Sequence, residues 1–248
     1  MSMLYGDNAI EYDTLIDDYQ FVSLFEKSKT LQTISNNFLP ATKLSKHCYR
    51  YMFYNCTSLK NAPKLPAKDL SEYTACYFGM FSYCEKLTTA PELPATKLSF
   101  SCYDNMFQSC YALTTAPELP ATSLAGNCYV QMFQNCKKLT KAPSILPATT
   151  LTDRCYQQMF EYCYELTTGP TLPAATLTPY CYHLMFAYNT KFNYIKMLAK
   201  DVSAEHCLTR WLDEVASNGT FVKHTNATWN IVGVDGIPST WTINYASS

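Results

Sequence analysis

A motif of about 26 residues is repeated along most of the chain, and this repeat constrains the fold more than any other feature. One copy, residues 93–118, reads LPATKLSFSCYDNMFQSCYALTTAPE. The spacing between the first cysteines of successive copies is 28, 26, 26, 27, 26 and 26 residues, for Cys48, Cys76, Cys102, Cys128, Cys155, Cys181 and Cys207. Periods of this length are typical of stacked supersecondary units. The sequence therefore predicts a solenoid, in which each repeat buries its apolar side chains against its neighbours.

The repeats divide the chain into three regions. Residues 1–38 hold an N-terminal segment and a degenerate capping repeat, and residues 198–248 hold a degenerate last repeat and a β-rich C-terminal cap. Between them, residues 39–197 form six repeats: 39–64, 65–92, 93–118, 119–145, 146–171 and 172–197. Atypical repeats at the two ends are what a solenoid needs to close its exposed apolar surfaces.

The first half of each repeat predicts a helix. It has the pattern Ser-x-x-Cys-Tyr-x-x-Met-Phe-x-x-Cys-x-x-Leu, as in residues 99–113. At 100° per residue its six apolar positions fall on one face about 140° wide, which indicates an amphipathic helix. A further helix is expected from Ser203 to about Ser217, ended by Gly219. Hydroxyl side chains occupy the expected N-cap positions, at Ser45, Ser71, Ser99, Thr152 and Thr178.

The second half of each repeat predicts a short strand. Segments 87–93, 113–119 and 166–172 carry Leu-Thr-Thr and a proline, and they are too short for a helix. Proline removes a donor from a strand ladder, so these strands should be brief. After the last repeat, residues 220–222, 228–232 and 241–243 also have strand-like composition, which indicates the β-rich cap. Together these patterns predict an α/β fold with one strand and one helix per repeat.

The twelve cysteines are too regular for a disulfide framework. Five pairs lie eight residues apart, none forms a CxxC motif, and the four histidines are scattered. Zinc-ligand spacing is therefore absent. Free cysteine behaves as a small buried hydrophobic residue, so we expect buried thiols and no cofactor, with disulfides or metal binding as the alternative.

Charge and composition narrow the classes of function. The formal net charge is −1, with 19 Lys and Arg against 20 Asp and Glu, so no basic field would attract nucleic acid. The sequence has no run of 18 apolar residues, so it predicts no membrane-spanning helix. The first residues show no signal peptide, so either the protein is not exported by this route or an upstream signal and further domains are missing. No nucleophile–base pattern or phosphate loop occurs, which argues against an enzyme.

The core of the repeat, M-F-x-x-C-x-x-L-x-x-A-P, resembles the F-x-x-C-x-x-L-x-x-I-x-I-P signature of BspA-like (Treponema-type) leucine-rich repeats. The match spans roughly residues 16–217, and the segment from Gly219 to Thr242 resembles the tail of Bacteroides-type arrays. The period of 26 exceeds the family's usual length of about 23, and Ala-Pro replaces Ile-x-Ile-Pro. The matching triplets are Phe53-Cys56-Leu59, Phe81-Cys84-Leu87, Phe107-Cys110-Leu113, Phe133-Cys136-Leu139 and Phe160-Cys163-Leu166.

This resemblance implies a right-handed leucine-rich-repeat solenoid on a bacterial cell surface or in a secreted protein. Its expected role is non-catalytic binding of a protein or glycan in adhesion, as a monomer or as part of a larger polypeptide. The alternative is a structural or receptor-binding decoration domain of a larger surface or phage assembly, which would make the protein virion-associated.

A leucine-rich-repeat solenoid presents its strands on a concave face, where exposed positions repeat laterally. The candidate binding residues on this face are Lys60, Asn61, Lys64, Thr88, Thr89, Glu92, Thr114, Thr115, Glu118, Lys141 and Thr168. The alternative is that they are simply solvated residues on a strand.

The tyrosines fall into two groups. The Tyr that follows the first Cys lies within the apolar face, so we expect it to pack in the core with its hydroxyl at an exposed edge. Tyrosines off the centre of that face are better candidates for exposed contacts. These are Tyr54, Tyr83, Tyr111, Tyr162 and Tyr188.

Overall fold

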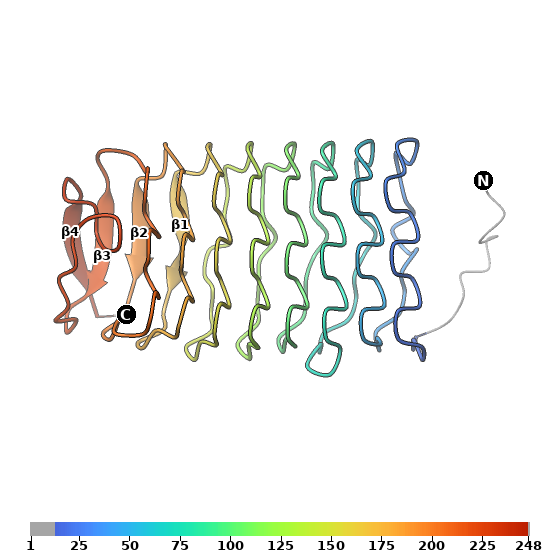
Figure 1. Ribbon diagram of the computed structural model, residues 1–248, viewed down its shortest axis with the longest axis horizontal. Helices are drawn as coiled ribbons and strands as arrows, with labels where there is room; N and C mark the ends of the chain where they lie inside the picture. Colours follow the sequence, from blue (N-terminus) through green and yellow to red (C-terminus); the bar gives the residue numbers. More distant parts are fainter. Residues whose placement is uncertain (1–12, 248) are drawn as a thin grey trace.

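The chain coils into a β-solenoid, whose coils are stacked along one axis (Figure 1). The computed structural model describes residues 13–247; residues 1–12, where the signal-peptide prediction falls, and residue 248 lie outside the described part. Within that part there is no α-helix, and so none long and apolar enough to cross a bilayer. The predicted solenoid is confirmed. The predicted α/β leucine-rich-repeat fold, with a strand and a helix in each repeat, is wrong.

Four parallel strands form one sheet at the C-terminal end of the stack. They are β1 (Thr168–Leu172), β2 (Tyr194–Met197), β3 (Thr220–His224) and β4 (Thr242–Ala246), in the order β1-β2-β3-β4. Earlier coils extend this side through isolated parallel bridges, such as Thr115 with Lys141. The segment 228–232, predicted as a strand, forms none. The C-terminal strands therefore continue the side of the solenoid that β1 and β2 begin.

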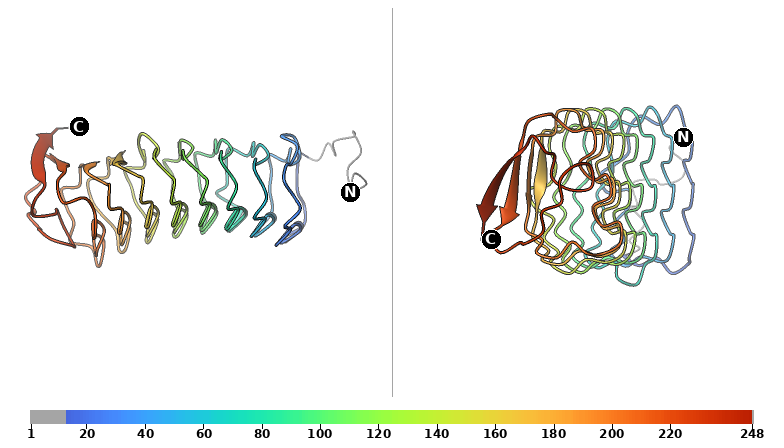
Figure 2. Two further views of the ribbon diagram at one scale, coloured as in Figure 1. Left: turned by 90° about the horizontal axis from the view of Figure 1, so that it is seen from above. Right: turned by 60° about the vertical axis from the view of Figure 1, so that its left-hand side comes forward.

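The segments predicted as helices are instead series of overlapping four-residue turns, which we call turn segments. In the segment that contains Cys48, alternate N–H groups bond to the carbonyl three residues earlier, as from Cys48 to Ser45 at 3.4 Å. The intervening N–H groups bond to the next coil, as from Tyr49 to Cys76 at 3.0 Å. Half of the hydrogen bonds of each turn segment are thus made between coils. Figure 2 shows the strands along one side of the stack and the turn segments along another.

Every fourth residue of a turn segment has a positive φ. In the segment of Cys48 these residues are His47, Tyr51 and Asn55, with φ of 56°, 54° and 55°. Type II turns require this left-handed conformation at their third residue. The predicted helix from Ser203 to Ser217 has the same character, because His206, Arg210 and Glu214 all have positive φ.

The helix prediction failed because the apolar pattern is too short to distinguish two periods. Cys-Tyr, Met-Phe and Cys recur every 4.0 residues, and over eight residues this departs from a 3.6-residue helix by only about 80°. Packing distance separates the two structures. The rings of Phe81, Phe107 and Phe133 stack on one another with centroids 5.6 Å apart. Packed helices lie about 8–10 Å apart, whereas neighbouring strands lie about 4.8 Å apart.

No helix exists for the predicted N-caps to cap. The hydroxyls of Ser45, Ser99 and Thr178 bond instead to backbone carbonyls of the preceding coil, those of Asp17, Tyr73 and Thr152, at 2.5–2.8 Å. The Ser71 hydroxyl bonds to the Asp69 carboxylate, and the Thr152 hydroxyl is buried without a partner in the described structure. These side chains therefore serve the contacts between coils or their own loop.

The core consists of parallel rows of identical side chains. The tyrosine after the first Cys is at most 2% exposed in each repeat from Tyr49 to Tyr182, which confirms that it packs in the core. Its ring stacks on its neighbours, as for Tyr77 and Tyr103 at 5.7 Å. The expected exposed hydroxyl is wrong for Tyr77 and Tyr156, whose hydroxyls are buried without a partner among the described residues.

The twelve cysteines are all buried, as predicted, and all are free thiols. The second thiol of a repeat donates to a carbonyl of the preceding coil, as from Cys110 to Phe81 at 3.2 Å and from Cys136 to Phe107 at 3.1 Å. Where Asn189 replaces this cysteine, its amide makes the corresponding bond to Phe160 at 2.9 Å. Burial raises the pKa of Cys136 to about 12.

We predict that the native thiols are nearly unreactive. Only the thiolate attacks a reagent such as dithionitrobenzoate. The raised pKa keeps the thiols protonated, and burial keeps the reagent from reaching them. At pH 8 most of the twelve thiols should react only after unfolding in guanidinium, in a spectrophotometric assay. A Thr140→Cys variant, with a thiol at an exposed position, should add one fast equivalent. Rapid reaction of most native thiols in the folded protein would contradict the core described above.

One buried carboxyl group makes stability depend on pH. Asp104 lies on a turn segment and is 7% exposed. Burial raises its pKa from 3.8 to about 7, although Ser101 and Asn105 donate hydrogen bonds to it. Well below pH 4 the carboxyl is protonated in both the folded and unfolded states, so it costs no stability. Between about pH 4 and 7 the unfolded state ionises while the folded state stays protonated, so stability falls over this range and levels off above pH 7.

We predict that Asp104→Asn is more stable than the parent protein at pH 8 and equally stable at pH 3. The pKa change from 3.8 to about 7 corresponds to roughly 4 kcal/mol at high pH. Thermal or urea unfolding across this pH range measures it. Asp69→Asn is a control of opposite sign, because bonds from Ser71 and Lys97 lower the pKa of Asp69 to about 2. That variant should lose stability at pH 7 and approach the parent protein near pH 2. A pH-independent effect of Asp104→Asn would contradict the assignment.

Candidate functional site

The predicted binding residues lie on the side of the solenoid that carries the strands. Thr168 begins β1, and Thr115 and Lys141 pair with each other in a parallel bridge. All are exposed except Asn61, which is half-buried. Sequence reasoning therefore identified solvent-facing positions of the repeat.

Several of these side chains bind the neighbouring coil. The Glu118 carboxylate accepts hydrogen bonds from the Ser144 N–H at 3.2 Å and the Ser144 hydroxyl at 2.9 Å. The Asn61 amide bonds to both the N–H and the carbonyl of Ile34, at 3.1 and 2.8 Å. These contacts stabilise the stack, and a role of this face in ligand binding stays a prediction.

A second candidate site is built on the turn segments. The residue before the second Cys of each repeat has a positive φ, and the residues at this position form a line along the stack that we call the corner row. Backbone bonds hold the row in register, as from the Tyr83 N–H to Gln108 at 2.8 Å and from the Asn135 N–H to Glu161 at 2.7 Å. The corner row consists of Lys27, Asn55, Tyr83, Ser109, Asn135, Tyr162, Tyr188 and Glu214.

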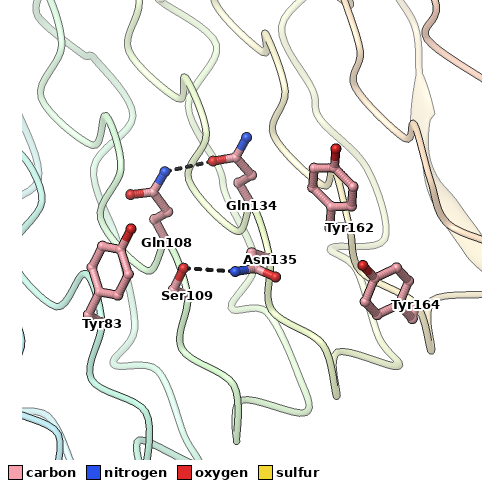
Figure 3. A pocket seen from close by; sticks show the side chains of 7 residues that line it. All are labelled: Tyr83, Gln108, Ser109, Gln134, Asn135, Tyr162 and Tyr164. Carbon is pink, nitrogen blue, oxygen red and sulfur yellow. Dashed lines mark hydrogen bonds between the residues drawn. The ribbon is translucent and has the colours of Figure 1, made fainter.

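Differences in side-chain size along the corner row create a hollow. Two short residues, Ser109 and Asn135, lie between the larger Tyr83 and Tyr162. A cavity of about 290 Å³ opens over them, which we call the turn-face hollow (Figure 3). Its lining residues are Tyr83, Gln108, Ser109, Gln134, Asn135, Tyr162 and Tyr164.

Aromatic contacts hold the two ends of the hollow in place. On one side Tyr83 meets Tyr54 edge to face at 5.6 Å. On the other side Tyr162 stacks on Tyr188 at 4.6 Å and meets the edge of Tyr164 at 6.3 Å. Such ring pairs contribute about 0.5–1.5 kcal/mol beyond their burial. The tyrosine walls are therefore positioned before any ligand arrives.

The floor is a chain of side-chain amides that ends on a carboxyl group. Gln108 Nε2 donates to Gln134 Oε1 at 2.6 Å, and Gln134 Nε2 donates to Glu161 Oε2 at 2.5 Å. Gln158 donates to the same Glu161 oxygen at 2.8 Å. Because this oxygen accepts from both Gln134 and Gln158, it orients them. The Gln108 and Gln134 amides thus each direct an N–H toward the C-terminal end of the stack, whereas the Asn135 amide donates to Ser109 in the preceding coil. Burial raises the pKa of Glu161.

The floor retains hydrogen-bonding capacity after these contacts. Asn135 Nδ2 donates to the hydroxyl oxygen of Ser109, which is buried, at 3.1 Å and so uses one of its two N–H groups. An amide carries two N–H donors and an oxygen acceptor, so each floor amide also keeps one N–H. None of the seven residues that line the hollow is charged. The described residues contain no cluster of three or more metal-ligating side chains. The hollow is suited to an uncharged ligand with many hydroxyl groups.

Sequence reasoning found the walls of this site but not its floor. Tyr83 and Tyr162 were among the tyrosines expected in exposed contacts, and both are partly exposed. Tyr111, another of them, lies outside the lining and carries the Lys137 ammonium over its ring at 5.0 Å. The floor residues and Tyr164 were missed; the available signal was that the two positions before the second Cys read Gln-Ser and Gln-Asn in consecutive repeats.

Comparisons with protein-family models, with curated proteins and with solved structures give no match for this chain.

Proposed function

We propose that this protein is a non-catalytic binding module that holds an uncharged carbohydrate in the turn-face hollow. The supporting observation is the pairing of two tyrosine walls, Tyr83 and Tyr162, with a neutral amide floor. A sugar ring has an apolar face of C–H groups and an edge of hydroxyls. The faces of the tyrosine rings suit the C–H face of the sugar, and amides that both donate and accept hydrogen bonds suit its hydroxyls.

The charge distribution favours a neutral sugar over an anionic one. Phosphate, sulfate and carboxylate groups are bound in proteins by Arg and Lys or by clustered backbone N–H groups. The Arg210 guanidinium lies over the ring of Tyr188, next to the Tyr162 wall, and is already bonded to Asp213 at 2.6 Å. The formal charge of the whole chain is −1, so long-range attraction of anions is weak.

The proposal includes a place for this module at a cell surface or outside the cell, in adhesion. Its support is the resemblance of the repeat to those of bacterial surface proteins, together with the aromatic composition of 20 tyrosines. A carbohydrate ligand suits that role, because surfaces of cells and matrices present sugars in many copies. Repeated weak contacts with such a surface give high overall avidity.

We predict that a glycan array will detect neutral oligosaccharides and that changes in the walls will weaken their binding. Tyr83→Ser and Tyr162→Asn install the residues that the corner row itself carries at 109 and 135, so the fold should tolerate them. Each should weaken binding about 10-fold in calorimetry, from the loss of roughly 1–1.5 kcal/mol of ring contact.

Tyr111→Ala is the matched control, because this partly exposed tyrosine lies outside the hollow. The Tyr111→Ala variant should bind the oligosaccharides as the parent protein does. Strong binding only to sulfated or sialylated glycans, or full binding by the double variant of Tyr83 and Tyr162, would refute the proposed site. Absence of any carbohydrate ligand would favour a structural role.

A further inference from the structure

We infer, on the basis of the function proposed above, that the hollow binds two successive sugars of an extended linear oligosaccharide, which lies along the solenoid axis with about one sugar per coil. The shape of the hollow carries this inference. Tyr83, Ser109, Asn135 and Tyr162 occupy the same position in four successive repeats. The hollow is therefore a track parallel to the stack and not a pocket within one coil.

The length of this track exceeds one sugar. Three coil steps separate Tyr83 from Tyr162, and at about 4.8 Å per step the walls lie roughly 14 Å apart. The buried rings beneath them, Phe81 to Phe160, follow steps of 5.5–5.6 Å. A single pyranose in contact with one wall does not reach the other. A pyranose in an extended chain advances by about one coil step, so successive sugars meet equivalent parts of the track.

The floor offers the same glutamine amide at each step. Gln108 and Gln134 occupy one position of the repeat, and Ser109 and Asn135 occupy the next. Two sugars would lie over these two coils, with their hydroxyls near the free amide N–H groups. Because the Gln108 and Gln134 amides point the same way along the stack, the two ends of a saccharide chain are not equivalent on this floor. A single orientation of the ligand is expected.

Both ends of the track are closed by aromatic rings. Beyond Tyr162 the ring of Tyr188 follows in parallel contact, with planes 5° apart, so no sugar fits between them. Beyond Tyr83 the ring of Tyr54 stands across it at 70°. The terminal sugars of the bound stretch would therefore contact Tyr83 and Tyr162. Two sugars, one over each of the coils of Ser109 and Asn135, fill the space between the two walls.

A chain-length series tests this geometry. The probes are linear oligomers of one to six units of glucose, mannose, xylose and N-acetylglucosamine, and calorimetry measures their Kd on the full chain. For the preferred sugar, affinity should rise from one unit to two and should not rise more than twofold from three to six. β-1,4-linked glucose oligomers, which are extended, should gain more per unit than α-1,4-linked ones, which curve.

The wall variants locate the ends of the ligand. In Tyr83→Ser or Tyr162→Asn, two units should bind about as well as one unit binds the parent protein, whereas Tyr111→Ala should leave the whole series unchanged. Thermal unfolding verifies that each variant is folded. A monosaccharide that binds as tightly as the dimer, weakened by the same wall variants, would overturn the linear ligand while leaving the proposed function intact. Absence of binding by every neutral sugar would overturn both.

Discussion

The hydrogen bonds between turn segments of adjacent coils are the interaction on which the rest of the structure depends. A turn segment satisfies only half of its N–H groups internally, and buried N–H groups must be paired. The other half need the next coil, as from Tyr77 to Cys102 at 3.1 Å. These bonds set a spacing close to that of strands, and this spacing places identical rings such as Tyr77 and Tyr103 in contact. One coil cannot meet either requirement alone, so the motif must recur.

These bonds also share one direction. On the turn segments the N–H groups that bond between coils point to the following coil, as from Phe81 to Met106 and from Phe107 to Met132. Parallel strands alternate their bonds and have little net dipole, whereas aligned peptide groups sum as they do in a helix. The positive end then lies at the last coil. There the Asp235 carboxylate accepts the Arg210 N–H at 2.7 Å, a negative group at the positive end.

The period of the cysteines from Cys48 to Cys207 was sufficient to predict a solenoid, buried thiols and a core tyrosine row. It was insufficient to predict turns, because Cys-Tyr-x-x-Met-Phe-x-x-Cys suits a helix equally well over eight residues. The local signal for turns was also weak. The described residues with positive φ include 23 that are not glycine, among them Tyr83 and Arg210, which are not turn-forming types. Their conformation is set by hydrogen bonds to the neighbouring coil, and the sequence of one segment alone holds no information about that coil.

The floor of the candidate site could not be predicted from the sequence, because it too depends on contacts between neighbouring coils. Gln108 and Asn135 are ordinary surface residues within their own repeats, and they form a floor only because the stack brings successive copies about 5 Å apart. The hydrogen bonds between coils and the packed core fix the backbone of the corner row, so the side chains of this row can differ from coil to coil. Tyr83, Ser109, Asn135 and Tyr162 share one backbone conformation, with φ of 60°, 58°, 61° and 60°. On a surface of this kind, one substitution per coil alters the groups offered to a ligand, and the rows of buried side chains that stabilise the fold stay the same.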